Sequence, residues 1–307
     1  MTKQELTNMV AEILSQMHGE TQPKVKGSDY KTVLYQTDEN AKQYHDGDFV
    51  PDVTQLDLRK LYLVEDAADA EKFRKMKEKT PARLGSGKAG PRYKTLTMLR
   101  FRADHAAAQD AVFSELDADF AKEHDLLPTK TRCSSKEEYL TRPDLGRSFD
   151  EHNAKTIKGV IDTPPRVQLV VGDGLSSAAI RANAMDCLQS IRDGLKIRGI
   201  ETGKTIFVKY CRVGAGDAIG DITGCELVCV LVGERPGLVT DKSMSAYITY
   251  RPHTGVSESS RTVVSNIHAQ GTPAVEAGAY VAELIGKILT KKVSGVGLHL
   301  EEARCLR

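Results

Sequence analysis

The sequence predicts an α/β protein, in which helices flank a mostly parallel sheet and a helical N-terminal region precedes that sheet. One observation is that, from about Val167 onward, short β-branched runs alternate with segments of helical length, as is typical of parallel sheets. The other is the run 227–232, Leu-Val-Cys-Val-Leu-Val, which is apolar at every position. Such a run is typical of a strand buried on both faces, and it is too short to span a membrane.

The expected elements follow in order along the chain. Charged residues predict a surface helix at 66–79, an apolar face predicts a second helix at 95–116, and a third helix is expected at 150–160. Strands are expected at 167–171, 205–210, 227–232, 246–250 and 263–267. They alternate with helices at 177–198, 217–223 and 272–289. For the last helix, we expect Thr272 to be the N-cap and Pro273 the first helical residue.

Residues 1–20 predict an amphipathic helix, because their apolar residues recur at i, i+3 and i+4 spacing. Thr2 and Glu5 have the spacing of a capping box. Residues 21–55 are polar, are interrupted by Gly and Pro, and predict a linker. The predicted helix at 1–20 either packs on its own domain or docks on another protein. The linker that follows it favours docking on another protein.

Charge and composition exclude several classes of function. Lys and Arg total 43 against 42 Asp and Glu, so the chain lacks the basic surplus that nucleic-acid binding requires. The six cysteines form no Cys-x-x-Cys pair, and the eight histidines do not cluster with carboxylates at zinc spacing. Neither a disulfide framework nor a metal site is therefore expected. We also expect no membrane partner and no secretory signal, because the first residues lack an apolar segment.

Three loops follow expected parallel strands, at 172–176, 211–216 and 233–237. We expect them to meet at one edge of the sheet, where open α/β sheets bind ligands. Their small residues allow a ligand to approach closely, and Asp173, Ser176 and Glu234 add hydrogen-bonding groups. These loops suit a large polar ligand rich in amides and hydroxyls. Plainer interpretations remain, since Gly172-Asp-Gly174 is a common strand-to-helix turn and Glu234 could pair with Arg235.

Two nucleotide-binding motifs are incomplete. The loop 83–92 is Gly-rich and basic, but Ala89 follows Lys88 where a phosphate-binding loop needs Ser or Thr. A dinucleotide fingerprint requires a third glycine three residues after Gly174, and Ser177 stands there instead. No nucleophile has an adjacent base, and no carboxylate pair is placed for acid–base catalysis. The chain is therefore expected to bind a ligand and to take its chemistry from a cofactor or a partner.

Six segments of the chain match those of a known family, in the same order. They are 87–92 (Gly-Lys-Ala-Gly-Pro-Arg), 99–105 (Leu-Arg-Phe-Arg-Ala-Asp-His), 139–144 (Tyr-Leu-Thr-Arg-Pro-Asp), 173–176 (Asp-Gly-Leu-Ser), 231–238 (Leu-Val-Gly-Glu-Arg-Pro-Gly-Leu) and 265–273 (Ser-Asn-Ile-His-Ala-Gln-Gly-Thr-Pro). From about residue 81 to residue 295, the chain resembles the small (light) subunit of ethanolamine ammonia-lyase, an enzyme that depends on adenosylcobalamin (coenzyme B12).

The resemblance implies a carbon–nitrogen lyase that converts ethanolamine to acetaldehyde and ammonia by a radical mechanism, and that is active only together with a large catalytic subunit. The helical segments after the linker predict a helical region at 56–160, and the resemblance implies a Rossmann-like domain at 161–307 that binds cobalamin at the interface with the large subunit. The family's cobalamin contacts carry over to Val213, Glu234 and Val263. Val263 departs from the family, in which a Cys is familiar at this place. No catalytic residue and no metal ligand carry over.

The resemblance also implies a location. Members of this family can work inside a bacterial microcompartment within the cytoplasm, and the helix at 1–20 is expected to address the chain to the shell of that compartment. Two alternatives stay open, a nucleotide-binding oxidoreductase on a similar sheet and a microcompartment adaptor protein without enzymatic function.

Overall fold

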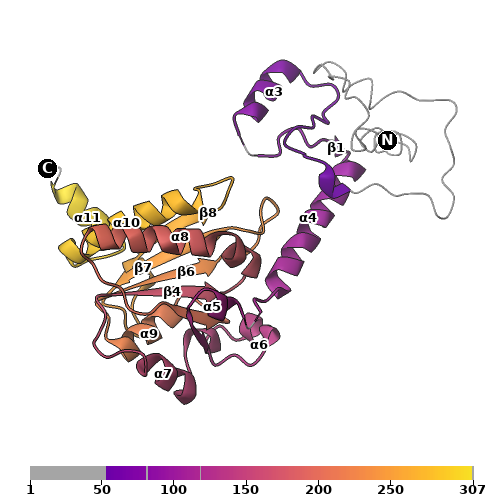
Figure 1. Cartoon of the computed structure of the whole chain (residues 1–307). Helices are drawn as coiled ribbons and strands as arrows, with labels where there is room; N and C mark the ends of the chain where they lie inside the picture. The colour runs from indigo at the N-terminus through magenta and orange to yellow at the C-terminus, as the bar shows by residue number, and fades with distance from the viewer. Residues whose placement is uncertain (1–52, 81, 118, 306–307) are drawn as a thin grey trace. The chain divides into compact units, whose positions relative to one another are not determined.

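The structure is a computed structural model that describes residues 53–80, 82–117 and 119–305 (Figure 1). The chain divides into two compact units, Met1–Ala106 and Ala107–Arg307. The predicted helix at 1–20 and all but the last three residues of the predicted linker at 21–55 lie outside the described residues.

The first unit has a small core of leucines. Leu56, Leu58 and Leu63 are buried together with Leu96, which lies on α4 (Thr95–Phe113). Lys77 is buried beside this core and donates a hydrogen bond from Nζ to the carbonyl oxygen of Leu58 at 2.7 Å. The other elements of the unit are η1 (Val53–Gln55), α3 (Ala70–Glu78), β1 (Lys88–Ala89) and β2 (Arg92–Tyr93).

The second unit is built on a six-stranded mixed sheet with the strand order β3-β5-β4-β6-β7-β8. The first four strands in this order are parallel, whereas β7 is antiparallel to both of its neighbours. The strands are β3 (Leu127–Lys130), β4 (Val167–Asp173), β5 (Ile206–Lys209), β6 (Leu227–Gly233), β7 (Met244–Tyr250) and β8 (Arg261–Ile267). The predicted α/β class is confirmed, and the run 227–232 lies in β6, which is buried along its whole length.

Helices cover both faces of this sheet (Figure 1). α8 (Ser177–Ile197) and α10 (Ala274–Lys291) pack on one face, where Ile191 and Ile285 belong to the larger core. α7 (Glu151–Lys158) and α9 (Ala215–Thr223) lie on the other face, where Ile157 and Ile219 belong to a second core. The remaining helical segments are α5 (Phe120–Glu123), α6 (Lys136–Thr141), η2 (Leu145–Arg147), η3 (Glu258–Ser260) and α11 (Val296–Cys305).

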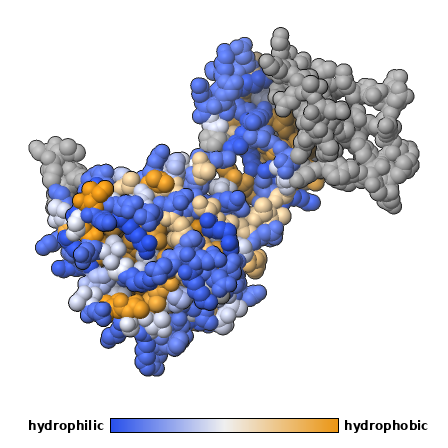
Figure 2. Space-filling model, viewed as in Figure 1, coloured by the Kyte–Doolittle hydropathy of each residue, from blue (hydrophilic) through white to orange (hydrophobic). Residues whose placement is uncertain are grey.

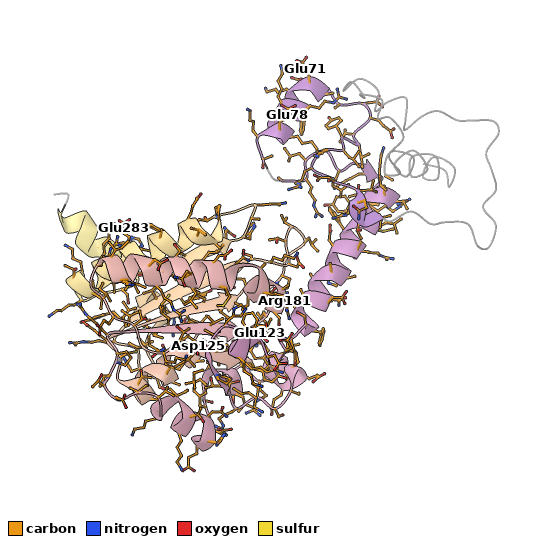
Figure 3. All side chains as sticks on the ribbon, viewed as in Figure 1. Glu71, Glu78, Glu123, Asp125, Arg181 and Glu283 are labelled. Atoms are coloured by element: carbon orange, nitrogen blue, oxygen red, sulfur yellow. The ribbon has the colours of Figure 1, made fainter. Side chains whose placement is uncertain are left out.

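The outer surfaces of the helices are mostly charged, as the amphipathic patterns predict. Figure 3 labels Arg181 on α8 and Glu283 on α10, and both side chains are about half exposed. Glu283 pairs with Lys287 one helical turn later at 2.8 Å. Figure 2 shows the corresponding surface as a mixture of hydrophilic residues and short apolar stretches.

The structure corrects the predicted start of the last helix. α10 begins at Ala274 with Pro273 as its N-cap residue, so Thr272 is not the cap. Thr272 instead donates its backbone N–H to the carbonyl oxygen of Asn266 and accepts from the backbone N–H of His268. These bonds hold Thr272 beside the end of β8, so it is unable to turn into the helix.

The division of the chain differs from the predicted one. A helical region is predicted at 56–160 and the sheet domain at 161–307, whereas the unit that holds the sheet begins at Ala107. The difference arises mainly from β3, which pairs in parallel with β5 at the edge of the sheet. β3 contains Pro128, which lowers its strand signal in the sequence and is tolerated because the strand is at an edge. Among the described residues, none of the helices has the length and apolar character needed to cross a bilayer.

Candidate functional site

The carboxyl ends of the parallel strands meet at one edge of the sheet, as predicted. Asp173 at the end of β4 is the register partner of Lys209 at the end of β5. β7 and β8 reach the same edge, since Met244 aligns with both Gly233 at the end of β6 and Ile267 at the end of β8. The loops that follow β4, β5 and β6 therefore lie side by side.

The polar side chains of the loop after β4 form hydrogen bonds within the protein. Asp173 is only 1% exposed, and its carboxylate accepts from the hydroxyl of Ser177 at 2.6 Å and from the backbone N–H of Leu116 at 3.1 Å. Burial raises the pKa of the Asp173 carboxyl. Ser176 caps α8 by accepting from the backbone N–H of Ala179 at 3.0 Å. Asp173 and Ser176 thus hold the loop and the helix in place and do not face a ligand.

Charged residues pair with one another next to this loop. Lys136 is buried and donates from Nζ to the carbonyl oxygen of Gly174 at 3.0 Å, and burial lowers the pKa of its ammonium group. Glu115 accepts from the hydroxyl of Tyr210 at 2.7 Å and pairs with Lys209 at the same distance. These interactions stabilise the edge of the sheet next to β4 and β5. The polar atoms of these side chains are bonded to other groups of the protein.

The loop after β5 carries Val213 and is braced by the segment 139–147. Tyr139 Oη donates to the carbonyl oxygen of Cys211 at 3.0 Å, and the backbone N–H of Arg212 donates to the carbonyl oxygen of Gly146 at 2.9 Å. The Arg212 guanidinium lies over the Tyr139 ring, with Cζ 4.4 Å from the ring centroid. A Cβ on Gly146 would lie 2.7 Å from Arg212 Cγ, so only glycine fits at this position. These contacts fix the backbone of Val213, whose side chain is half-buried at the start of α9.

Glu234 follows β6 and is half-buried. Its backbone N–H donates to the carbonyl oxygen of Ser243 at 2.9 Å, and its Oε1 accepts from the hydroxyl of Tyr247 at 2.7 Å. In the part of the chain that the structure describes, no other group donates to this carboxylate, so Oε2 is available to a ligand. Arg235 is exposed and forms no ion pair with Glu234 there, which excludes the plain salt-bridge interpretation.

Val263 lies on β8 and is 46% exposed, which is unusual for a valine in the middle of a strand. Its register partner on β7 is Tyr247. Arg261, two residues earlier, points to the same side of the sheet and bonds Asp217 on α9. Val263 therefore lies on the face of the sheet that α9 partly covers.

The three predicted ligand contacts lie on one face of the sheet, with Tyr247 among them. Val213 and Tyr247 both pack against the core between α9 and the sheet. Tyr247 bonds Glu234 and aligns with Val263. Sequence reasoning missed Tyr247, because strand alternation indicates only its face and nothing in the sequence connects it with a residue 13 positions earlier.

This arrangement offers hydrogen-bonding and apolar groups to a ligand. Among the described residues, no group of His, Cys, Asp and Glu side chains could hold a metal ion. The described cysteines at the site are poor nucleophiles, since burial raises the pKa of the Cys211 thiol to about 12. The face offers one free carboxylate oxygen between apolar side chains, and Ser245 beside it has a buried hydroxyl without a described hydrogen-bond partner.

Two other motifs from the sequence have structural roles. Asp104 on α4 pairs with Arg83 at 2.6 Å and with Arg100 at 2.9 Å, and all three side chains are largely buried. His268 accepts at Nδ1 from the backbone N–H of Gln270 at 3.3 Å and so shapes the loop before α10.

Comparisons with known proteins agree with the resemblance. The family described as "Ethanolamine ammonia-lyase light chain (EutC)" matches residues 70–299. The ethanolamine ammonia-lyase small subunit of Clostridium perfringens is 53% identical over 298 residues, which cover 97% of this chain and 100% of that protein. The small subunits of Listeria innocua and Fusobacterium nucleatum are 52% and 48% identical, over 97% and 96% of this chain and 100% and 98% of theirs. The chain belongs to the ethanolamine ammonia-lyase light chain family, whose members are also named small subunits.

Proposed function

We propose that this chain is the small subunit of an adenosylcobalamin-dependent ethanolamine ammonia-lyase, in which it binds cobalamin at the interface with a large catalytic subunit. The family membership supports the reaction, the conversion of ethanolamine to acetaldehyde and ammonia. The observation that carries the binding role is the face formed by Val213, Glu234 and Val263. When bound, adenosylcobalamin supplies the radical chemistry through homolysis of its cobalt–carbon bond.

The side chains of this face fit a corrin ring. Such a ring has a broad surface and a rim of amide groups. The free Oε2 of Glu234 suits an amide N–H donor, and a hydrogen bond to a charged acceptor is stronger than one between neutral groups. The exposed side chain of Val263 and the half-buried side chain of Val213 offer apolar contact. Val263 has no thiol, so this proposal assigns it an apolar contact at the place where a Cys is familiar.

The fold supports the assignment of a Rossmann-like domain. Three parallel strands have the order β5-β4-β6, and helices lie on both faces of the sheet. In such sheets a ligand binds outside the carboxyl ends of the strands. Glu234 and Val213 lie in loops at those ends, so the proposed site is where this class of sheet binds its ligands.

Reconstitution tests this function. Acetaldehyde release from ethanolamine is measured with adenosylcobalamin and a purified large subunit, with and without this chain. Activity that needs both chains supports the proposal, and Glu234→Ala should then raise the adenosylcobalamin concentration needed for half-maximal activity. The proposal would be contradicted if a large subunit that is active with another small subunit stayed inactive with this folded chain.

We also propose that residues 1–20 address the assembled enzyme to a bacterial microcompartment. The apolar stripe of this segment and the polar stretch that follows it support the proposal. Deletion of residues 1–20 should leave the enzyme active and release it into the cytosol, as fractionation of cells would show. Encapsulation of the truncated chain would contradict the role of the helix.

A further inference from the structure

We infer that Tyr247 is a positioning residue of the cofactor site, which holds the Glu234 carboxylate in the orientation that accepts an amide N–H of the cobalamin. This inference rests on the proposed function and adds to it a residue that does not itself need to touch the cofactor. Its basis is the 2.7 Å hydrogen bond from Tyr247 Oη to Glu234 Oε1.

The position of Tyr247 is determined by the sheet and not by a loop. In the register of the three strands, Tyr247 on β7 aligns with Val230 on β6 and with Val263 on β8. Side chains at aligned positions of neighbouring strands lie on the same face and contact one another. The ring also packs against the core beneath α9, and this packing fixes the position of the hydroxyl that donates to Glu234.

The hydrogen bond leaves one carboxylate oxygen for a ligand. Glu234 lies just beyond the end of β6, where its own backbone is held by the bond to Ser243 but its side chain has three rotatable bonds. Ordering a side chain of this kind costs conformational entropy when a ligand binds. Because Tyr247 already holds Oε1, Oε2 is oriented before the cofactor arrives, and part of that cost is removed from binding.

Tyr247 stays a hydrogen-bond donor at neutral pH. Burial raises the pKa of its phenol, and the bond to the Glu234 carboxylate raises it further. The phenol therefore keeps its proton and continues to donate to Oε1 of Glu234. Glu234 keeps the role of acceptor for both its partners.

Tyr250 provides a matched control. It lies on the same strand, and its hydroxyl also donates to a glutamate, Glu226, at 3.3 Å. Tyr250 aligns with Leu227 at the amino end of β6, away from the carboxyl edge where Glu234 lies. Tyr250→Phe therefore removes the same atom and the same kind of bond without affecting Glu234.

The test measures cobalamin affinity directly, by equilibrium dialysis of the reconstituted complex with adenosylcobalamin in the dark. We expect Tyr247→Phe to raise the dissociation constant about tenfold, since a hydrogen bond to a charged group contributes roughly one decade of equilibrium constant. Tyr250→Phe should bind like the wild type. In kinetics, Tyr247→Phe should raise the apparent KM for adenosylcobalamin and leave kcat near the wild-type value.

A double-mutant cycle distinguishes a positioning role of Tyr247 from a general loss of stability of the site. In the Glu234→Ala background there is no carboxylate to orient, so adding Tyr247→Phe should change the dissociation constant by less than about twofold. An equal loss in both backgrounds, or wild-type affinity of Tyr247→Phe, would overturn the inference. If the wild-type complex itself does not bind adenosylcobalamin, the proposed function fails instead.

Discussion

Arg261 on β8 and Asp217 on α9 form a buried ion pair in which two guanidinium nitrogens meet two carboxylate oxygens, at 2.7 and 2.8 Å. The two side chains are 3% and 8% exposed. Hydrogen bonds from Arg261 to Asp217 raise the pKa of the guanidinium. This pair connects α9, which starts two residues after Val213, with the strand that carries Val263.

Removing the charge of Asp217 should destabilise the protein strongly. Asp217→Asn removes the buried carboxylate and leaves the mostly exposed carboxylate of Glu258, 2.7 Å from Arg261 Nε, as the remaining counter-charge, a change that should cost about 1–3 kcal/mol of unfolding free energy. Urea unfolding of the purified chain measures the change. As a control, Glu151→Gln removes the exposed partner of Lys155 on α7 and should have little effect. An unfolding midpoint of Asp217→Asn equal to that of the wild type would show that the pair does not hold α9.

A second prediction concerns the end of β6, where two backbones touch. A Cβ on Gly233 would lie 2.0 Å from the carbonyl oxygen of Ser176, and no side-chain rotation relieves a contact with backbone. Gly233→Ala should therefore separate the β4 and β6 loops and cost about 3 kcal/mol or more, the upper end for overpacking. Gly237→Ala, four residues later, meets no atom within 4 Å and should be neutral. Equal melting temperatures of the two variants would contradict this packing.

A third prediction concerns the brace of the Val213 loop. Tyr139→Phe removes the only hydroxyl that donates to the buried carbonyl oxygen of Cys211 in the described structure, and an unsatisfied buried acceptor costs about 1–3 kcal/mol. The same change frees the backbone next to Val213, so cobalamin affinity should fall as well. Thermal unfolding and equilibrium dialysis measure the two effects. Unchanged stability together with unchanged affinity would contradict the role of Tyr139 as a brace of this loop.

The sequence predicts the main elements of the sheet well because their signals are local. The apolar run of β6 and the glycines that end β4 and β6 identify the strands and the edge at which Glu234 and Val213 lie. Local signals do not identify an element whose conformation depends on tertiary contacts. β3 is hidden by Pro128, which only an edge position tolerates, and Thr272 leaves its predicted cap role because β8 uses its backbone groups.

The resemblance named the residues of the candidate site, but the sequence did not predict their arrangement. The resemblance supplied Val213, Glu234 and Val263, whereas their common face depends on the antiparallel register of β7 and β8. That register also places Tyr247 beside Glu234. Pairing between strands depends on non-local contacts, which a single sequence does not show. Asp173 illustrates the converse, since its position in a strand-end loop suggested a ligand contact although the residue is buried.

The buried thiols give a fourth prediction. Cys133, Cys187, Cys211, Cys225 and Cys229 are buried and free, and burial raises the pKa of the Cys187 thiol to about 12. A thiol reagent at pH 8 should therefore leave these five unmodified in the folded chain, because the thiolate is the reactive form. A Cys305→Ser variant isolates them, and mass spectrometry after labelling counts the modified sites. Rapid labelling in the absence of denaturant would contradict their burial.

The last prediction is a pH dependence that arises from Glu115. Burial alone would raise the pKa of this carboxyl, but hydrogen bonds from Lys209 and Tyr210 outweigh burial, and the net shift is downward from 4.5. A carboxyl with a lowered pKa in the folded state stabilises the protein above its unfolded pKa and loses this contribution as the pH falls through the folded value. Glu115→Gln should therefore be less stable than the wild type at pH 7, by about 1 kcal/mol at most because the group is partly exposed.

The difference between wild type and Glu115→Gln should shrink as the pH is lowered from 7 to below the shifted pKa, where the wild-type carboxyl is protonated as well. Urea unfolding midpoints at a series of pH values measure this trend. Lys209→Met serves as the reciprocal control, since it removes the partner and should likewise reduce the pH dependence. A difference that stays constant or grows toward acid pH would mean that the carboxylate of Glu115 is not stabilised by its bonds to Lys209 and Tyr210.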